Sequence, residues 1–259
     1  MTRSDTRRHV LERTARVGAA AILGASLVAG AAGRVLAVNG GACNAPYDIT
    51  VAPSDFTDGS GRPNAIDNPY FPLVPGTSFR YEGMKEGASL VDVMTVTGDT
   101  RVLMGVTVSV VRDTAYEDGV LAEDTFDWYA QDDAGNVWYF GEDTTEYNPD
   151  GTPLTTEGSW EAGQHGNLPG LLMQAQPRSG DTYRQEYAPD VAVDMATVIS
   201  THRQIDVPYG RLTNVVETKE FSCIEKTIDH KFYAPGVGLV RELAIANGRE
   251  STVLVSKTP

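Results

Sequence analysis

Acidic residues that could do chemistry gather around one stretch of the sequence, residues 124–143. Asp127 and Glu142 lie on the two sides of its turn, and Glu186 follows later in the chain. Two carboxyl groups held close together in an apolar cleft differ in pKa, so that one could act as an acid and the other as a base. Such oxygens could also bind a hard cation. The simplest alternative is an acidic rim in water, as expected for a very acidic protein.

A β-hairpin is expected to position Asp127 and Glu142. Residues 132–135 are typical of a turn, because Asp caps turns and Gly accepts a positive φ. With a four-residue loop, Tyr129 pairs with Trp138 and Asp127 with Phe140, and Trp128 lies on the face opposite Trp138. A loop longer or shorter by one residue would change these faces. The face predicted in this way carries Thr125, Asp127, Tyr129, Trp138, Phe140 and Glu142.

Further candidate residues lie beyond this hairpin. Residues 161–170 hold three glycines and one proline, which predicts a loop that could bring His165 close to a ligand beside Trp160. The alternative for His165 is an ordinary surface position. No Cys-x-x-Cys or His-Glu-x-x-His pattern is present, so we assign no metal ligands, no catalytic residue and no particular cofactor. The predicted ligand-binding residues are Asp127, Tyr129, Trp138, Phe140, Glu142, Trp160, His165 and Glu186.

The N-terminus carries the pattern of an export signal. Residues 6–11 (TRRHVL) are typical of the twin-arginine translocation signal. The apolar run 17–32 that follows is short for a membrane span of about 20 residues, and residues 35–37 resemble a cleavage site. We therefore predict a signal peptide at 1–37 and an exported protein of the cell envelope or extracellular space, with no stable membrane span after cleavage. The alternatives are an ordinary secretory signal and an uncleaved anchor.

The mature chain would be strongly acidic. The full sequence has 21 Lys and Arg against 35 Asp and Glu, a net charge of −14. Cleavage after residue 37 removes six arginines and two acids, which leaves 15 basic and 33 acidic residues and a net charge of −18. Such a surface repels nucleic acid and anionic lipid, so we expect neither as a partner. Solubility alone could explain the charge.

Two cysteines remain in the mature chain, Cys43 and Cys223. In an oxidising compartment a pair of cysteines far apart in sequence predicts a disulfide bond. This bond would join the N-terminal arm to a late strand. The alternative is two unpaired thiols.

The sequence predicts an all-β fold. Residues 38–75 contain six prolines, which exclude a regular helix or a central strand and indicate a Pro-rich arm that packs on the sheet. Within this arm, residues 68–73 could form a stiff wedge over one end of the sheet. Residues 76–259 read as a single β domain of about eleven short strands. Strands at this spacing favour an antiparallel meander, whose twist curls it into a half-barrel or barrel.

Four motifs resemble a group of uncharacterised exported bacterial proteins. They are residues 68–73 (NPYFPL), 135–142 (GNVWYFGE), 158–163 (GSWEAG) and 233–240 (YAPGVGLV). The resemblance extends over about residues 64–245 and implies export and a β-rich fold, but it implies no reaction and no site residues. The last motif also resembles closing strands of lipoprotein-carrier-like half-barrels.

These observations favour a binding function. The aromatic and acidic hairpin face suits an apolar or amphiphilic small molecule, and no recognisable nucleophile accompanies it. We therefore predict an exported binding protein for such a ligand. Two alternatives stay open: a small barrel enzyme that uses carboxylate acid/base chemistry, and a cation-binding envelope protein. Whether the protein is an enzyme is not decided by its sequence.

Overall fold

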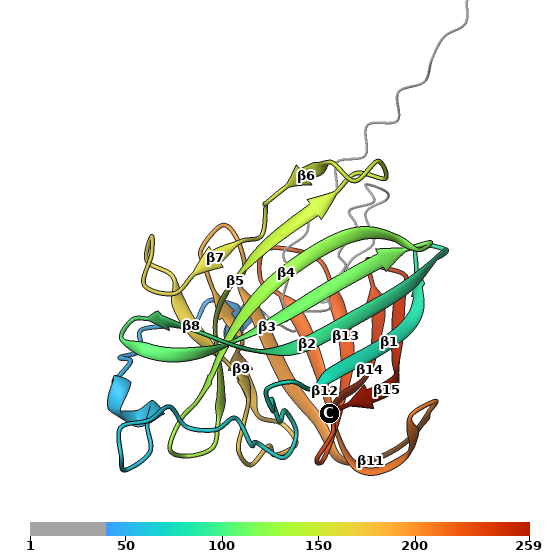
Figure 1. The fold of residues 1–259 in the computed structure, drawn as a ribbon. Helices are drawn as coiled ribbons and strands as arrows, with labels where there is room; N and C mark the ends of the chain where they lie inside the picture. Colours follow the sequence, from blue (N-terminus) through green and yellow to red (C-terminus); the bar gives the residue numbers. More distant parts are fainter. Residues whose placement is uncertain (1–39) are drawn as a thin grey trace, which may run out of the picture.

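A computed structural model describes residues 40–259, and the predicted signal peptide lies outside the described residues. The described residues form one 15-stranded antiparallel sheet with two short helices, α1 (Gly40–Cys43) and η1 (Pro53–Phe56) (Figure 1). The strands are β1 (Ser78–Lys85), β2 (Ala88–Leu103), β3 (Val106–Glu117), β4 (Val120–Gln131), β5 (Val137–Tyr147), β6 (Pro153–Thr155), β7 (Trp160–Glu161), β8 (Leu168–Met173), β9 (Thr182–Arg184), β10 (Glu186–Tyr187), β11 (Asp194–Val207), β12 (Gly210–Ser222), β13 (Ile228–Ala234), β14 (Gly238–Ala246) and β15 (Glu250–Thr258).

The sheet nearly closes into a barrel (Figure 1). Its strand order is β10-β8-β5-β4-β3-β2-β1-β15-β14-β13-β12-β11-β9, and β6 and β7 pair with β5 outside this path. The two ends of the order, β9 and β10, are separated in sequence only by Gln185, whose amide donates a hydrogen bond to the Asp194 carbonyl at 2.8 Å. The predicted all-β antiparallel meander, curled toward a barrel, is confirmed.

The Pro-rich arm places the wedge, residues 68–73, at one end of this barrel. The Phe71 ring is buried between two tyrosines of distant strands, 5.4 Å from Tyr129 of β4 and 6.4 Å from Tyr233 of β13. The Gly236 amide donates to the Pro69 carbonyl at 2.7 Å, at the turn between β13 and β14. Because one side chain touches both tyrosines, Tyr129 and Tyr233 face each other across the inside of the barrel.

A disulfide bond joins Cys43 and Cys223, with their Cα atoms 5.6 Å apart, and confirms the predicted pairing. It ties α1 to the loop after β12, across 180 residues of sequence. The Arg184 guanidinium donates to the Cys43 carbonyl at 3.3 Å beside this link. The N-terminal arm is therefore held at two places, by the wedge and by the disulfide.

The inner surface of the barrel changes character along its axis. Toward the wedge the inward side chains are apolar or aromatic, as for Tyr129 on β4, Tyr233 on β13 and Leu254 on β15. Further from the wedge the same strands turn charged groups inward, because side chains two residues apart share a face. The buried charged side chains of this acidic half are Asp92, Asp113, Asp127, Glu142, Glu146, Glu186, Glu220, Asp229, Lys231, Glu242 and Glu250.

Candidate binding site inside the barrel

A β-bulge aims Asp127 and Glu142 into the barrel. Asp127 pairs with Glu142 and Tyr129 with Tyr139, so one residue of β4 stands opposite two residues of β5. The extra residue is accommodated at Gly141, whose φ of 119° is unfavourable for residues with a side chain. The bulge restores the inward direction of β5, and Glu142 follows Tyr139 on the inner face.

This register corrects the predicted hairpin. Gln131 pairs with Val137, so five residues, 132–136, form the loop instead of four. Tyr129 therefore pairs with Tyr139 and not with Trp138, and Asp127 pairs with Glu142 and not with Phe140. The one-residue shift moves Trp138 and Phe140 to the opposite face, away from the two acids.

Trp138 and Phe140 lie on the outer face of the sheet, under η1. The Phe56 ring is 6.4 Å from Trp138 and 5.7 Å from Phe140. The Trp138 indole donates to Asp132 Oδ2 at 2.8 Å. Trp138 pairs with Ala130, two residues from Trp128, so the two tryptophans share a face and the prediction that they lie on opposite faces is wrong.

Three buried carboxyl groups on the inner face act on one another through their charges, and we call Asp127, Glu142 and Glu186 the carboxylate cluster. Their side chains are 0%, 1% and 0% exposed. The Tyr139 hydroxyl donates to Asp127 Oδ1 at 2.7 Å, and the Trp160 indole donates to Glu186 Oε2 at 3.0 Å. The Tyr139 ring stacks on Tyr129 at 4.9 Å and meets Trp160 edge-on at 5.5 Å. Aromatic rings thus form the walls around the acids.

Glu142 is the least satisfied member of this cluster. Both of its carboxyl oxygens are buried and have no hydrogen-bond partner in the described part of the chain. The Tyr139 hydroxyl lies close enough to lower the pKa of Glu142, but it has one proton, which the 2.7 Å bond to Asp127 uses. A buried acceptor without a donor is costly, so Glu142 is suited to accept hydrogen bonds from another molecule.

Electrostatics favour the neutral forms of Glu142 and Glu186. Burial raises the pKa of Glu142 well above its ordinary value, and the neighbouring Glu186 and Asp127 raise it further. Burial and Asp194 likewise raise the pKa of Glu186, against the lowering effect of the Trp160 hydrogen bond. Burial and the neighbouring carboxyl groups therefore favour the protonated forms of Glu142 and Glu186.

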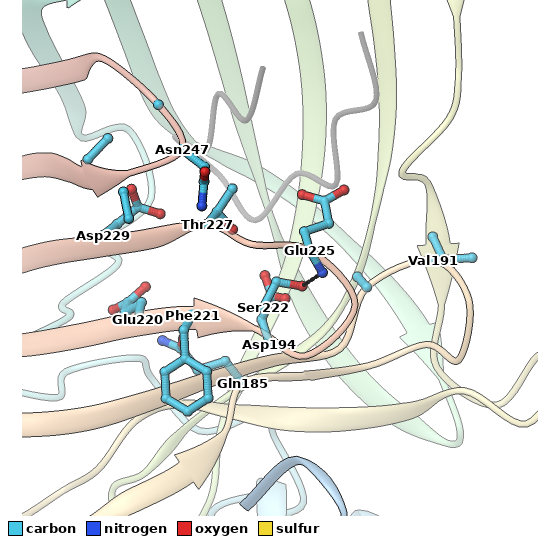
Figure 2. Close-up of a pocket in the computed structure, with 14 residues that line it drawn as sticks. Gln185, Val191, Asp194, Glu220, Phe221, Ser222, Glu225, Thr227, Asp229 and Asn247 are labelled. Atoms are coloured by element: carbon cyan, nitrogen blue, oxygen red, sulfur yellow. Dashed lines mark hydrogen bonds between the residues drawn. The ribbon is translucent and has the colours of Figure 1, made fainter. Parts of the chain in front are cut away.

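A pocket opens at the acidic end of the barrel, away from the wedge. Figure 2 shows Asp194, Glu220, Glu225 and Asp229 around it. These are the charged residues of its lining, and burial raises the pKa of both Asp194 and Asp229 to about 6. The pocket volume is about 20 Å³, enough for about one water molecule. Asp194 connects the pocket to the cluster, because its charge acts directly on Glu186.

Five of the eight predicted ligand-binding residues come together at this site. They are Asp127, Tyr129, Glu142, Trp160 and Glu186. Trp138 and Phe140 are on the outer face, as described above. His165 is exposed at a turn and has a positive φ of 52°, away from the cluster.

Sequence reasoning missed several charged residues of the inner surface, notably Glu220, Lys231 and Glu242. The Lys231 ammonium is 3.3 Å from Glu220 Oε2 and 3.9 Å from Glu242 Oε2. The signal that could have found them is the alternation of Asp229, Lys231 and Tyr233 along one strand. Charged residues at alternate positions usually indicate a face in water, so this pattern alone predicts the wrong side of the sheet.

Comparisons with known proteins give the following results. No protein-family model matches the chain, and no curated protein matches it. Two solved structures are similar at 15% identity and a TM-score of 0.41, and each aligns with 73% of this chain. One is a "putative exported protein with YmcC-like fold" from Bacteroides fragilis NCTC 9343, of which 99% is covered. The other is a "putative lipoprotein" from Parabacteroides distasonis ATCC 8503, of which 98% is covered.

Between residues 40 and 259, no helix has the length and hydropathy needed to cross a membrane. In the same part of the chain, no group of three or more His, Cys, Asp or Glu residues is arranged to hold a metal ion.

Proposed function

We propose that the protein is an exported binding protein of the cell envelope or extracellular space, and that its barrel takes one amphiphilic small molecule. The polar group of the ligand sits at the carboxylate cluster and its apolar part points toward the wedge. The observation that carries this proposal is Glu142, whose two buried oxygens have no donor at the boundary between the acidic and the apolar halves.

The proposed ligand is amphiphilic because the inner surface of the barrel changes along its axis, from apolar near the wedge to acidic at the other end. Tyr129 and Tyr139 lie on the wedge side of Asp127 and Glu142 on the same face. Aromatic walls supply contact area for an apolar chain, while a few polar groups orient the molecule. A ligand with two different ends matches this surface better than a uniformly apolar one.

Export is supported by the cysteines as well as by the signal pattern. The described part of the chain holds no free cysteine, because Cys43 and Cys223 pair with each other. Disulfide bonds persist mainly in oxidising compartments outside the cytoplasm.

Native mass spectrometry of the protein purified from its own host tests this proposal. We expect a wild-type mass above that of the mature polypeptide by one small molecule. Glu142→Gln should lose the adduct. The glutamine amide is neutral, and only its oxygen accepts hydrogen bonds, whereas both oxygens of the Glu142 carboxylate can accept them. Phe126→Ala should keep the adduct and serves as the control, because Phe126 lies on the outer face of β4 and is 38% exposed. A bare polypeptide mass for the wild type, or an adduct retained by Glu142→Gln, would contradict the proposal.

A further inference from the structure

The inside of this barrel already holds a primary ammonium group, that of Lys231. Its side chain is 4% exposed, and its Nζ atom lies between Glu220 Oε2 at 3.3 Å and Glu242 Oε2 at 3.9 Å. Burial lowers the pKa of Lys231, but the attraction of Glu220 and Glu242 outweighs this effect and the net pKa is raised. A cationic amine is therefore stable among the inward carboxylates.

A second, partly buried amine is also held by carboxyl groups. The Lys85 ammonium is 3.1 Å from Glu117 Oε1. Burial lowers the pKa of Lys85, whereas Glu250, Glu117 and Glu123 raise it, and the net shift is upward. Lys85 pairs with Glu250 between β1 and β15, so this second ammonium also belongs to the acidic half.

The carboxylate cluster resembles the groups of acids around Lys231 and Lys85, but no lysine of residues 40–259 lies among its carboxyl groups. In the described part of the chain, no ion pair within 4.0 Å reaches Glu142 or Glu186. Both oxygens of Glu142 and the Oε1 atom of Glu186 are buried without a hydrogen-bond partner. Three open acceptor atoms match the three donors of one primary ammonium group.

We propose that the carboxylate cluster is the receptor for a primary ammonium group carried by the ligand. This inference rests on the proposed binding function and names the chemical class of its ligand, an amphiphilic primary amine. The ammonium donates to Glu142 and Glu186, and the alkyl part lies along Tyr129 and Tyr139 toward the wedge.

The ionisable groups that face Glu142 make amine binding depend on pH. Burial, Glu186 and Asp127 all oppose its ionisation in the empty protein. An ammonium group binds the ionised carboxylate, so its arrival should expel protons and the affinity should rise with pH. The groups around the cluster are Asp127 and Tyr129 from β4, Tyr139 from β5, Trp160 from β7, and Glu186 from β10, with charge effects from Glu123, Asp194 and Lys231.

Calorimetric titration of the mature protein with three probes tests whether the ligand binds through an ammonium group. Octylamine, octanol and octanoate share one alkyl chain and differ in charge. We expect octylamine to bind at least tenfold more tightly than octanol and octanoate not to bind. Measurements in two buffers of different ionisation enthalpy should show release of about one proton per octylamine and of none per octanol.

Variants then locate the bound amine. Glu142→Gln and, independently, Glu186→Gln should weaken octylamine at least tenfold and leave octanol unchanged. Glu146→Gln is the matched control, because Glu146 lies on the same face of β5 but its charge interaction is with Lys85. Circular dichroism checks that each variant is folded.

The outcomes separate the two claims. Equal binding of octanol and octylamine without proton release would overturn the ammonium site and keep the binding function. Unchanged octylamine affinity in both Glu142→Gln and Glu186→Gln would also overturn the ammonium site, because the amine would then bind elsewhere. Binding of none of the probes by the folded protein would count against both.

Discussion

Replacement of Glu142 by glutamine should stabilise the ligand-free protein, and the gain should grow with pH. Glu142 has an ordinary pKa of 4.5, and burial with Glu186 and Asp127 nearby raises its pKa in the folded protein well above that value. At pH 7 the unfolded chain therefore has an ionised Glu142, whereas the raised pKa favours a bound proton at Glu142 in the folded chain. Folding must take up this proton, and the amide of glutamine needs none.

The size of the effect follows from this proton uptake. Each pH unit above 4.5 costs about 1.4 kcal/mol, which sets a ceiling of about 3.4 kcal/mol at pH 7 and about 0.7 kcal/mol at pH 5. The second N–H of the amide has no acceptor in place and costs about 1 kcal/mol. We expect Glu142→Gln to gain about 2 kcal/mol at pH 7 and nothing at pH 5. The sign agrees with linkage, because a raised folded pKa makes the wild type lose stability as pH rises above 4.5.

Urea unfolding at pH 5, 6 and 7 measures this difference. Glu157→Gln is the control, because Glu157 is exposed and the same substitution there should change stability little at any pH. A loss of unfolding free energy in Glu142→Gln at every pH would refute the reasoning. It would mean that Glu142 is charged and paired in the free protein.

Three other predictions follow. Arg7→Lys combined with Arg8→Lys should block export, and normal amounts of mature protein outside the membrane would reject the twin-arginine route. Reduction of the Cys43–Cys223 bond should lower the unfolding free energy by about 4–5 kcal/mol, and an unchanged urea midpoint would contradict this. Gly141→Ala should cost about 3 kcal/mol or more, because its Cβ would lie 2.2 Å from the Trp160 carbonyl oxygen at a φ of 119°; native stability would show that the bulge tolerates a side chain.

The parts of the fold that could be predicted from the sequence are those with a local sequence signal. The turn at residues 132–135, the prolines of the arm and the pair Cys43 and Cys223 each have a local or compositional signal. The wedge could be placed because Phe71 lies between prolines that prevent regular pairing. The register between β4 and β5 could not be predicted in the same way. Alternation assumes a period of two, and the bulge at Gly141 adds one residue without any change in the surrounding apolar pattern.

The candidate site was readable only in part. Asp127, Glu142 and Trp160 are close in sequence, so a hairpin with its next strand brings them together. Glu186 joins them because β10 pairs with β8 at one end of the nearly closed sheet, a contact set by strand order. The ion pair of Lys231 with Glu242 depends in the same way on how β13 and β14 turn their faces inward. A charge on a strand does not reveal which side of a closed sheet it faces.

The most direct test of this account is the protonation state of Glu142 with and without an amine. Infrared difference spectroscopy of the wild type against Glu142→Gln isolates the carbonyl band of its protonated carboxyl group. At pH 7 we predict that this band is present in the free protein and disappears when octylamine saturates the site. A band that persists at saturation, or that is already absent from the free protein, would contradict the central claim.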